Sequence, residues 1–312
     1  MLRLEASFVA PFFRELVTTN RWKTPTRPFT PGQDAIGIVE SVGDGVPGHV
    51  SGNRVYCDTL LRGHGLVDEG HCFIGTFATG ASGLRLQQDW PDGAFAQQVV
   101  LPAECLVPIP PEVDADPAIL CRLGWLGTAW GALERAHLQP GERVAVNGAT
   151  GLIGTSTVLA ALAMGAGSVR VIGRRRVILD ELSSHDHRIV IEDGRSRQDI
   201  DVVVDCVEAD DPSSTERAIG MLRRGGRAVI VGGVDASISL DYGWFIGREA
   251  TVTGSMWLPR GDWRRLLAQI VSGSLDLSPL RCRRFMLQEI NGAIDAAVSE
   301  AGGFEHVAIV HS

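Results

Sequence analysis

The spacing of hydrophobic and polar positions changes near residue 140 of the chain. Across residues 31–55, short apolar segments alternate with polar positions and are broken by glycine and proline, which predicts a strongly turned, partly open β barrel. Residues 57–92 are rich in glycine and show little periodicity, and residues 94–110 return to strand-like alternation. The first part of the chain is therefore expected to be mostly β, with an irregular lobe in its middle.

The second part of the chain has the pattern of a parallel sheet. Residues 142–175 read ERVAVNGATGLIGTSTVLAALAMGAGSVRVIGRR, which predicts an apolar strand, a glycine turn, an Ala/Leu helix and a second apolar strand. Further apolar strands at 201–206 and 227–232, separated by a helical segment, are typical of a doubly wound α/β sheet. An amphipathic helix around 263–271, a further helix and a closing strand complete the chain.

Composition excludes several functional classes. The chain has 312 residues, which favours two domains. Its net charge of -8 and pI near 5.5 argue against a nucleic-acid partner. The sequence has no apolar run of about eighteen residues, so we expect no membrane partner. The six cysteines are scattered without a CxxC pair, which disfavours a disulfide scaffold or a zinc ribbon and favours a cytoplasmic location.

The glycine turn predicts a dinucleotide site because it follows a strand and opens a helix. Residues without a Cβ let the backbone approach a diphosphate, and the N–H groups and dipole at the helix start favour its charge. The alternative is a tight turn that binds nothing. The residues expected to hold the cofactor here are Gly148, Thr150, Gly151, Leu152, Ile153 and Gly154.

The end of the second strand favours NADP(H) over NAD(H). A site for NAD normally has an acidic residue there to hold the ribose 2′-hydroxyl, whereas this chain has Arg174, Arg175 and Arg176. Guanidinium groups can hold a 2′-phosphate with paired hydrogen bonds. The alternative is a solvated basic turn neutralised by Asp180 and Glu181.

Several segments in the same order resemble the medium-chain dehydrogenase/reductase superfamily. PGQDAIGIVESVG is similar to the PGHExxGxVxxVG segment of that family, SGNRV to its GDRV, GTAWGAL to its TAYxAL helix, and EINGAIDAA to its C-terminal helix. The resemblance implies a GroES-like, mostly β catalytic domain (residues 1–124 and 259–312) and a Rossmann nucleotide-binding domain (125–258). It also implies a homodimer, with residues 236–253 as the contact segment. The residues that it places near the nicotinamide are Thr128, Val231, Ser255 and Trp257.

The resemblance breaks at the zinc sites. The positions assigned to the catalytic zinc ligands carry Ser7, Gln33 and approximately Gly124, none of which supplies a thiolate, imidazole or carboxylate. The four cysteines of the structural zinc lobe are also absent, so we expect no metal. An unusual metal site stays open as an alternative, with the ligands Cys57, His64, His71 and Cys72.

The proton relay of the family is replaced by Ala10, Phe12 and Phe13, which predicts an apolar pocket wall. The sequence therefore predicts a zinc-independent, NADPH-dependent oxidoreductase that reduces a small apolar enone, quinone or ketone. On chemical grounds the candidate proton donors are Tyr56 and His64. The alternatives are a metal-free alcohol dehydrogenase working oxidatively, and a non-redox or non-catalytic protein that retains the nucleotide-binding fold.

Overall fold

The computed structural model describes residues 1–19, 22–63, 70–194, 199–208, 211–233, 237–259 and 262–311, which form two compact units. Unit 1 comprises Met1–Leu123, Leu280–Ala301 and Glu305–Ser312, and unit 2 comprises Gly124–Pro279 and Gly302–Phe304. The chain thus returns to unit 1 at residue 280 rather than at the expected 259. Residues 259–279 belong to unit 2 because their helix packs against the helix that opens that unit.

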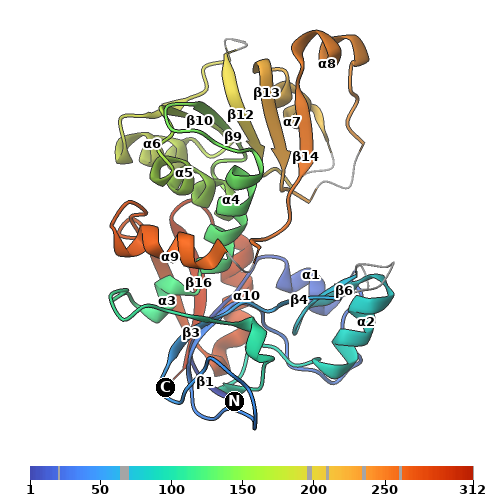
Figure 1. Cartoon of the computed structure of the whole chain (residues 1–312), viewed down its shortest axis with the longest axis vertical. Coiled ribbons are helices and arrows are strands. Elements are labelled where there is room, and N and C mark those ends of the chain that lie inside the picture. The colour runs from blue at the N-terminus through green and yellow to red at the C-terminus, as the bar shows by residue number, and fades with distance from the viewer. Residues whose placement is uncertain are drawn as a thin grey trace. The chain divides into compact units, whose positions relative to one another are not determined.

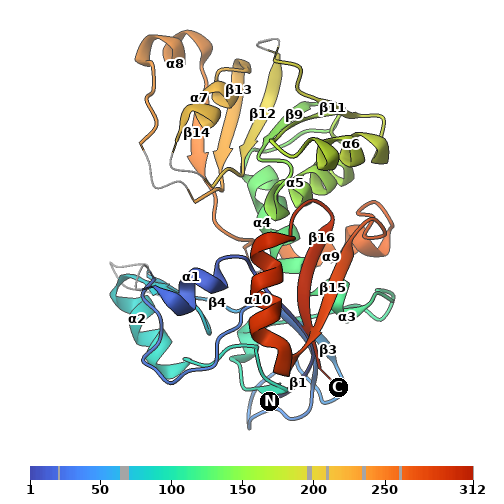
Figure 2. The same ribbon diagram turned by 180° about the vertical axis from the view of Figure 1, so that it is seen from behind.

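A mixed β sheet forms the centre of unit 1. The elements of the unit are β1 (Leu2–Phe8), α1 (Phe13–Thr18), β2 (Ala35–Val39), β3 (Arg54–Cys57), β4 (Leu60–Arg62), β5 (His71–Phe73), β6 (Phe77–Thr79), α2 (Gly80–Asp89), β7 (Gln98–Val99), η1 (Ala103–Cys105), β8 (Leu106–Pro108), α3 (Pro117–Leu120), β15 (Arg281–Met286), η3 (Leu287–Glu289), α10 (Ile290–Ser299) and β16 (Glu305–Val310). The strand order is β15-β16-β1-β2-β3-β8, with β7 paired to β1, and a smaller sheet has the order β4-β5-β6. Figure 2 shows α10 lying along β15 and β16.

The core of unit 1 lies against β1, β2 and β3. Alternate residues of β1 point inward, so that Leu2 and Leu4 are buried beside Val39 and Val55 while Arg3 between them is exposed. This period of two is the one expected for a strand that buries one face. The GroES-like, mostly β domain predicted from the sequence is confirmed.

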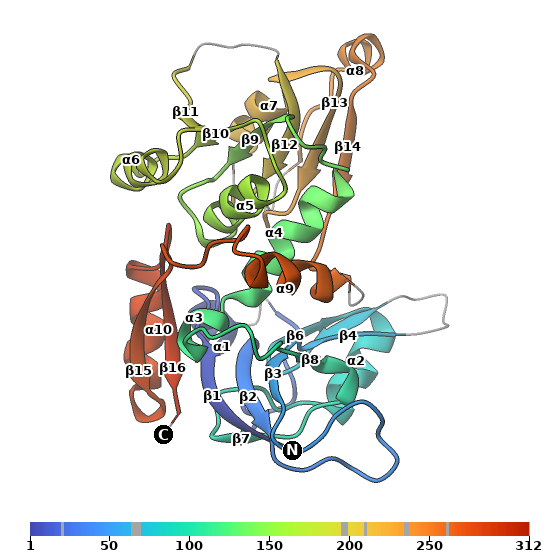
Figure 3. The same ribbon diagram turned by 60° about the vertical axis from the view of Figure 1, so that its left-hand side comes forward.

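Unit 2 is built on a parallel sheet with the strand order β11-β10-β9-β12-β13-β14, of which Figure 1 labels every strand but β11. Its elements are α4 (Leu123–Arg135), β9 (Arg143–Asn147), α5 (Leu152–Ala163), β10 (Ser168–Ile172), α6 (Arg176–His185), β11 (Ile189–Ile191), β12 (Ile200–Asp205), α7 (Ser213–Ile219), β13 (Leu222–Ile230), α8 (Tyr242–Arg248), β14 (Thr251–Gly254) and α9 (Trp263–Val271). Figure 3 shows α5 and α6 beside β9, β10 and β11, while α7 contacts β9, β12 and β13 and α8 contacts β13. The predicted Rossmann fold is therefore confirmed.

Two predictions about partners concern the surface of the fold. Of the segment expected to join two subunits, residues 237–253 are described and include α8, whereas Ala236 lies outside the described residues. Within the described ranges, no helix combines the length and apolar character that crossing a bilayer requires.

Replacing Gly127 with alanine is expected to destabilise unit 2 by about 1–3 kcal/mol, because overpacking a filled core forces a shift of its side chains. A Cβ at position 127 in α4 would lie 2.5 Å from Cη2 of Trp263, whose side chain is 1% exposed on α9. The free energy of unfolding in urea measures the effect. Gly247→Ala on α8 is the control, because its Cβ would meet no atom within 4 Å. Equal stabilities of the two variants would contradict the packing of α9 on α4.

Candidate nucleotide-binding site

The turn between β9 and α5 brings backbone N–H groups to the carboxyl edge of the sheet. Gly148 has a φ of +80°, which only glycine adopts without strain, and its N–H donates to the Ile172 carbonyl at 3.0 Å. The N–H of Ala149 donates to the same carbonyl at 2.9 Å, which fixes the turn to the end of β10. Helix α5 then begins at Leu152, with Gly151 as its N-cap, so its first N–H groups and the positive end of its dipole face this edge.

The protein constrains Gly154 and Gly151 of the turn to different degrees. A Cβ on Gly154 would overlap the Gly148 carbonyl oxygen and lie 2.7 Å from Ala149 Cα, so the chain itself demands glycine there. Gly151 has an ordinary φ of −86°, and its Cβ would meet no atom closer than 3.4 Å. Neither packing nor conformation requires glycine at position 151. A ligand lying against the backbone would be a reason for glycine there, and the open space beside Gly151 is compatible with a diphosphate.

A buried hydrogen-bond network fixes the strand ends where the sheet order reverses, between β9 and β12. The Asn147 side-chain amide donates to the Asp205 carboxylate at 2.6 Å, and Thr215 Oγ1 donates to the other carboxylate oxygen at 3.0 Å. Burial raises the pKa of Asp205, although both hydrogen bonds oppose that shift. Ligands of doubly wound sheets bind at this switch point, so these side chains hold together the floor of the candidate site.

The three arginines after β10 have different surroundings. Arg176 forms an ion pair with Asp180 at 2.9 Å on the exposed side of α6, as the neutralised basic turn predicts. The Arg175 guanidinium donates from Nη2 to the Thr150 carbonyl in the glycine turn. Arg174 is exposed. Arg176 is thus paired with a carboxylate on α6, whereas the Arg175 guanidinium lies against the glycine turn.

The residues predicted to bind the nicotinamide carboxamide lie along the same edge. Val231 follows β13 and Ser255 follows β14, and both strands end at the carboxyl edge that holds the turn. The Val231 N–H already donates to the Asp205 carbonyl at 2.9 Å, and the Ser255 N–H donates to the Ile230 carbonyl at 2.9 Å. Their carbonyl oxygens are therefore the groups that could accept a hydrogen bond from a carboxamide.

Thr128 and Trp257 are both largely buried. Thr128 is 7% exposed, and its hydroxyl donates to the Gly124 carbonyl at 2.9 Å within α4. Trp257 is 8% exposed and has a φ of +64°, a left-handed conformation that is rare for a bulky side chain. A Cβ on Gly131 would lie 2.6 Å from the Trp257 carbonyl oxygen, so a glycine in α4 allows this backbone path. Their roles toward a nicotinamide stay predictions.

Tyr56 is not placed to act as a proton donor to a substrate. Its side chain is fully buried in β3, and its hydroxyl donates to Asp34 Oδ1 at 2.5 Å. Burial and then the charge of Asp34 raise the pKa of Tyr56 well above its usual value. Burial also raises the pKa of Asp34 to about 8. The prediction for Tyr56 therefore needs correction, because its proton is held inside unit 1. His64 lies outside the described residues.

Of the four residues considered as metal ligands, the structure describes Cys57, His71 and Cys72. Burial raises the pKa of the Cys57 thiol and raises that of Cys72 to about 12, which disfavours the thiolates that bind metals. His71 contacts the Thr79 hydroxyl. Among the residues that the structure describes, no group of three histidine, cysteine or carboxylate side chains could hold a metal ion.

Ser7 and Gln33 are also buried. Ser7 Oγ donates to the Ala94 carbonyl at 2.6 Å and lies 2.9 Å from His311 Nε2. Gln33 is 7% exposed. The hydroxyl at position 7 is thus fixed in the interior of unit 1.

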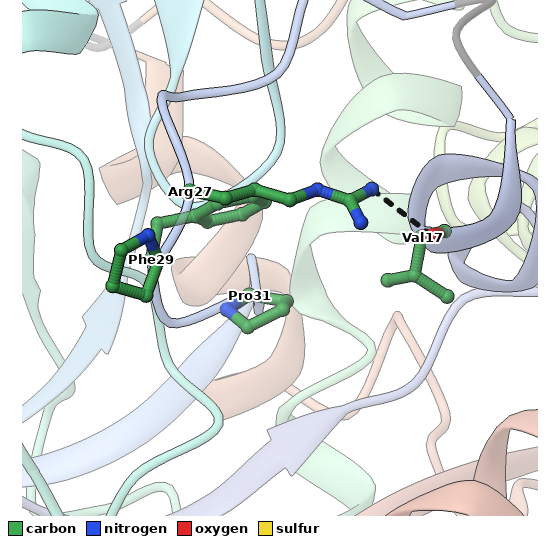
Figure 4. A pocket seen from close by; sticks show the side chains of 5 residues that line it. Val17, Arg27, Phe29 and Pro31 are labelled. Atoms are coloured by element: carbon green, nitrogen blue, oxygen red, sulfur yellow. Dashed lines mark hydrogen bonds between the residues drawn. The ribbon is translucent and has the colours of Figure 1, made fainter.

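A cavity of about 500 Å³ lies beside α1 in unit 1. Figure 4 shows Arg27 extending past Phe29 and Pro31, and its Nη2 donates to the Val17 carbonyl at 3.0 Å. Pro28 completes the lining. Among the described residues that line this cavity, Arg27 carries the one ionisable side chain.

Comparisons with known proteins agree with both halves of this description. Residues 7–111 match the alcohol dehydrogenase GroES-like domain, and residues 153–272 match the zinc-binding dehydrogenase domain, so together the two models span more than half of the chain. The chain belongs to the medium-chain dehydrogenase/reductase superfamily. The family resemblance predicted from the sequence is thus confirmed, and this superfamily member is an oxidoreductase of a family that binds nicotinamide cofactors.

Relatives of this superfamily member differ in their substrates. An acryloyl-coenzyme A reductase of Metallosphaera sedula is 28% identical over 275 residues, covering 85% of this chain and 78% of its own. A thermostable alcohol dehydrogenase of Pyrobaculum aerophilum has a TM-score of 0.78 at 27% identity, covering 99% of this chain and 90% of its own. A dehydrogenase structure from Sinorhizobium meliloti 1021, solved with NADP, has a TM-score of 0.80 at 22% identity and covers 99% and 90% of the two chains.

Sequence reasoning missed the polar groups that support the site in this superfamily member. Asn147 and Asp205 each end an apolar strand, and polar residues at strand ends were the signal that could have identified them. Asp34, which accepts the hydrogen bond from Tyr56, was also missed, although it follows Gln33 in the segment that carries the family resemblance. The contact between Thr150 and Gly303 had no local signal, because 153 positions separate the two residues.

Proposed function

We propose that this protein binds NADP(H) in preference to NAD(H) and reduces a small apolar enone, quinone or ketone by hydride transfer without a zinc ion. The observation that carries the cofactor choice is the pair Arg174 and Arg175 directly after β10, next to the glycine turn. A guanidinium there can hold a 2′-phosphate with charge-assisted hydrogen bonds, which are stronger than a hydrogen bond to a neutral ribose hydroxyl, so NADP(H) is favoured.

The parts of the chain have separate roles in this proposal. Bound NADPH supplies the hydride, so the protein needs to bind and orient the cofactor and the substrate. The turn around Gly151 holds the diphosphate, Arg174 contacts the 2′-phosphate, and the carbonyl groups after β13 and β14 orient the carboxamide. Support for an apolar substrate comes from Phe12, which stacks on Phe13 with ring centroids 5.0 Å apart and lies 6.1 Å from the ring of Trp22.

Two alternatives use the same nucleotide site. The burial of Tyr56 supports a protein that binds the nucleotide without catalysis, because this residue was a candidate proton donor. An alcohol dehydrogenase working oxidatively would need a base to remove the hydroxyl proton. Titration of metal-stripped protein with NADPH and NADH, followed by an enone, quinone and alcohol panel, separates the three. NADPH-dependent reduction that survives chelation supports our proposal, alcohol-dependent NADP⁺ reduction supports the second alternative, and binding without turnover supports the first.

Replacing Arg174 with glutamine is expected to weaken NADPH binding about tenfold while NADH binding changes less than about twofold, because one charge-assisted contact with the 2′-phosphate is lost. Quenching of tryptophan fluorescence gives both dissociation constants. Arg176→Gln is the matched control, since that guanidinium is paired with Asp180 and should leave the NADPH/NADH ratio unchanged. If Arg174→Gln weakened both nucleotides equally, the 2′-phosphate would not be bound at this position.

A further inference from the structure

Three segments that are distant in the sequence meet at the Thr150 carbonyl oxygen. Thr150 lies in the glycine turn, and its carbonyl accepts the N–H of Gly303 at 3.0 Å. The same oxygen accepts a hydrogen bond from Nη2 of Arg175, the N-cap residue of α6. A residue pair near the C-terminus, Gly302 and Gly303, therefore supports both the turn and an arginine of the candidate site.

Both glycines are required by the close approach of α6. Gly302 has a φ of +141°, and a Cβ there would overlap Nη2 of Arg175 and lie 2.6 Å from Cζ of that guanidinium. Gly303 has a φ of +58°, and its Cβ would lie 2.9 Å from Cγ2 of Ile178. The guanidinium can lie against the Thr150 carbonyl because position 302 has no side chain.

The next residue extends this contact to the far end of α6. The ring of Phe304 is 2% exposed and meets the His185 ring edge to face, with centroids 5.7 Å apart. Residues 302–304 thus contact α6 near its first residue and at its last one. This contact fixes the start of α6 relative to the glycine turn.

The charges at the start of α6 suit a bound anion. Burial and the charge of neighbouring Arg174 lower the pKa of Arg175. The two positive charges repel each other, and a phosphate that contacted both guanidinium groups would replace this repulsion with two attractions. The Thr150 side chain packs on the other flank, since a Cβ on Gly173 would lie 2.6 Å from its Cγ2.

We propose that Gly302 and Gly303 position the Arg175 guanidinium beside the glycine turn and thereby set the preference for a 2′-phosphorylated nucleotide. The inference rests on the proposed NADP(H) function, and it assigns a positioning role to two residues that would not touch the cofactor.

Gly302→Ala is the direct test, because the atom that a new Cβ would displace is the far end of a flexible side chain. The probes are 2′,5′-ADP and 5′-ADP, whose dissociation constants are measured by calorimetry on the full-length protein. We expect affinity for 2′,5′-ADP to fall about tenfold and affinity for 5′-ADP to stay within about twofold, since one charged contact is misplaced. Gly273→Ala is the control for backbone strain, because Gly273 has a φ of +76° and its Cβ would meet no atom within 4 Å.

A double-mutant cycle separates positioning from a general effect on the fold. In an Arg175→Met background, which should itself lose the preference, Gly302→Ala should cause no further change in the ratio of the two dissociation constants. Equal weakening of both probes by Gly302→Ala, or a full additional loss in the Arg175→Met background, would overturn the inference.

Phe304→Leu is a milder variant for the case in which Gly302→Ala fails to fold. It should lower the 2′,5′-ADP preference in the same direction, by about two- to threefold, because it removes one aromatic contact with α6. An unchanged preference in this variant would count against the inference. Failure of the wild-type protein to bind either probe would instead remove the proposed function, and the inference with it.

Discussion

Asp34→Asn is expected to remove a loss of stability that the wild-type protein suffers as pH rises from about 4 to about 8. The Asp34 side chain is 1% exposed, and burial raises the pKa of its carboxyl group to about 8, with the Tyr56 hydrogen bond opposing the shift and the charge of Asp58 adding to it. In the unfolded chain the same group ionises near its usual pKa of 3.8. Across this interval the unfolded chain releases a proton that the folded protein retains, so the free energy of unfolding falls with rising pH.

The size of this effect follows from the difference between the two pKa values. Between pH 5 and pH 8 the wild-type protein should lose on the order of 4 kcal/mol from this group, whereas an asparagine cannot ionise and still accepts the Tyr56 hydrogen bond. Urea unfolding of both proteins at the two pH values gives the change in the free energy of unfolding with pH for each. The contributions of the other titrating groups cancel when one change is subtracted from the other. Asp44→Asn, at an exposed position in unit 1, is the control and should follow the wild-type profile. Parallel profiles for the wild-type protein and Asp34→Asn would show that Asp34 is ionised in the folded state.

Gly154→Ala and Gly151→Ala are expected to abolish nucleotide binding for different reasons. In Gly154→Ala, the Cβ would overlap the Gly148 carbonyl, so the turn must move; we expect binding of NADPH and NADH to weaken at least about a hundredfold, with a loss of about 1–3 kcal/mol in stability. In Gly151→Ala, the Cβ would meet no protein atom closer than 3.4 Å, so stability should be unchanged while binding is still lost.

The comparison of binding with stability in these two variants tests the position of the diphosphate. Equilibrium dialysis gives the binding loss, and thermal unfolding without nucleotide gives the stability. Retention of wild-type affinity by Gly151→Ala would mean that no diphosphate lies against this turn, whatever the behaviour of Gly154→Ala.

Local patterns in the sequence predicted the parts of the site that are contiguous in the chain. The strand, glycine turn and helix at 143–163 could be predicted because their period and their glycines are local. The arginines after β10 could be located for the same reason, although their different partners could not. Arg176 pairs with Asp180 four residues along a helix, which helical spacing allows, whereas the partner of Arg175 is a backbone carbonyl 25 residues earlier.

Contacts between distant strands explain what the sequence could not provide. Tyr56 was considered a proton donor because of its chemistry, and its pairing with Asp34 depends on the antiparallel register of β2 and β3, where Ile36 lies opposite Tyr56. The family resemblance implied that the nucleotide-binding domain ends at residue 258, but the packing of Trp263 on Gly127 keeps α9 in unit 2.

The nucleotide-binding unit is not one continuous segment, because the two units alternate along the chain. A fragment of residues 124–279 would contain β9 to β14 and the whole glycine turn, yet it would lack Gly302–Phe304, which belong to the same unit. The Thr150 carbonyl would then lose the Gly303 N–H, and α6 would lose the ring of Phe304. Residues 124–279 alone are therefore not a complete nucleotide-binding unit. Transferring this unit into another protein of the superfamily would require the donor's C-terminal segment as well.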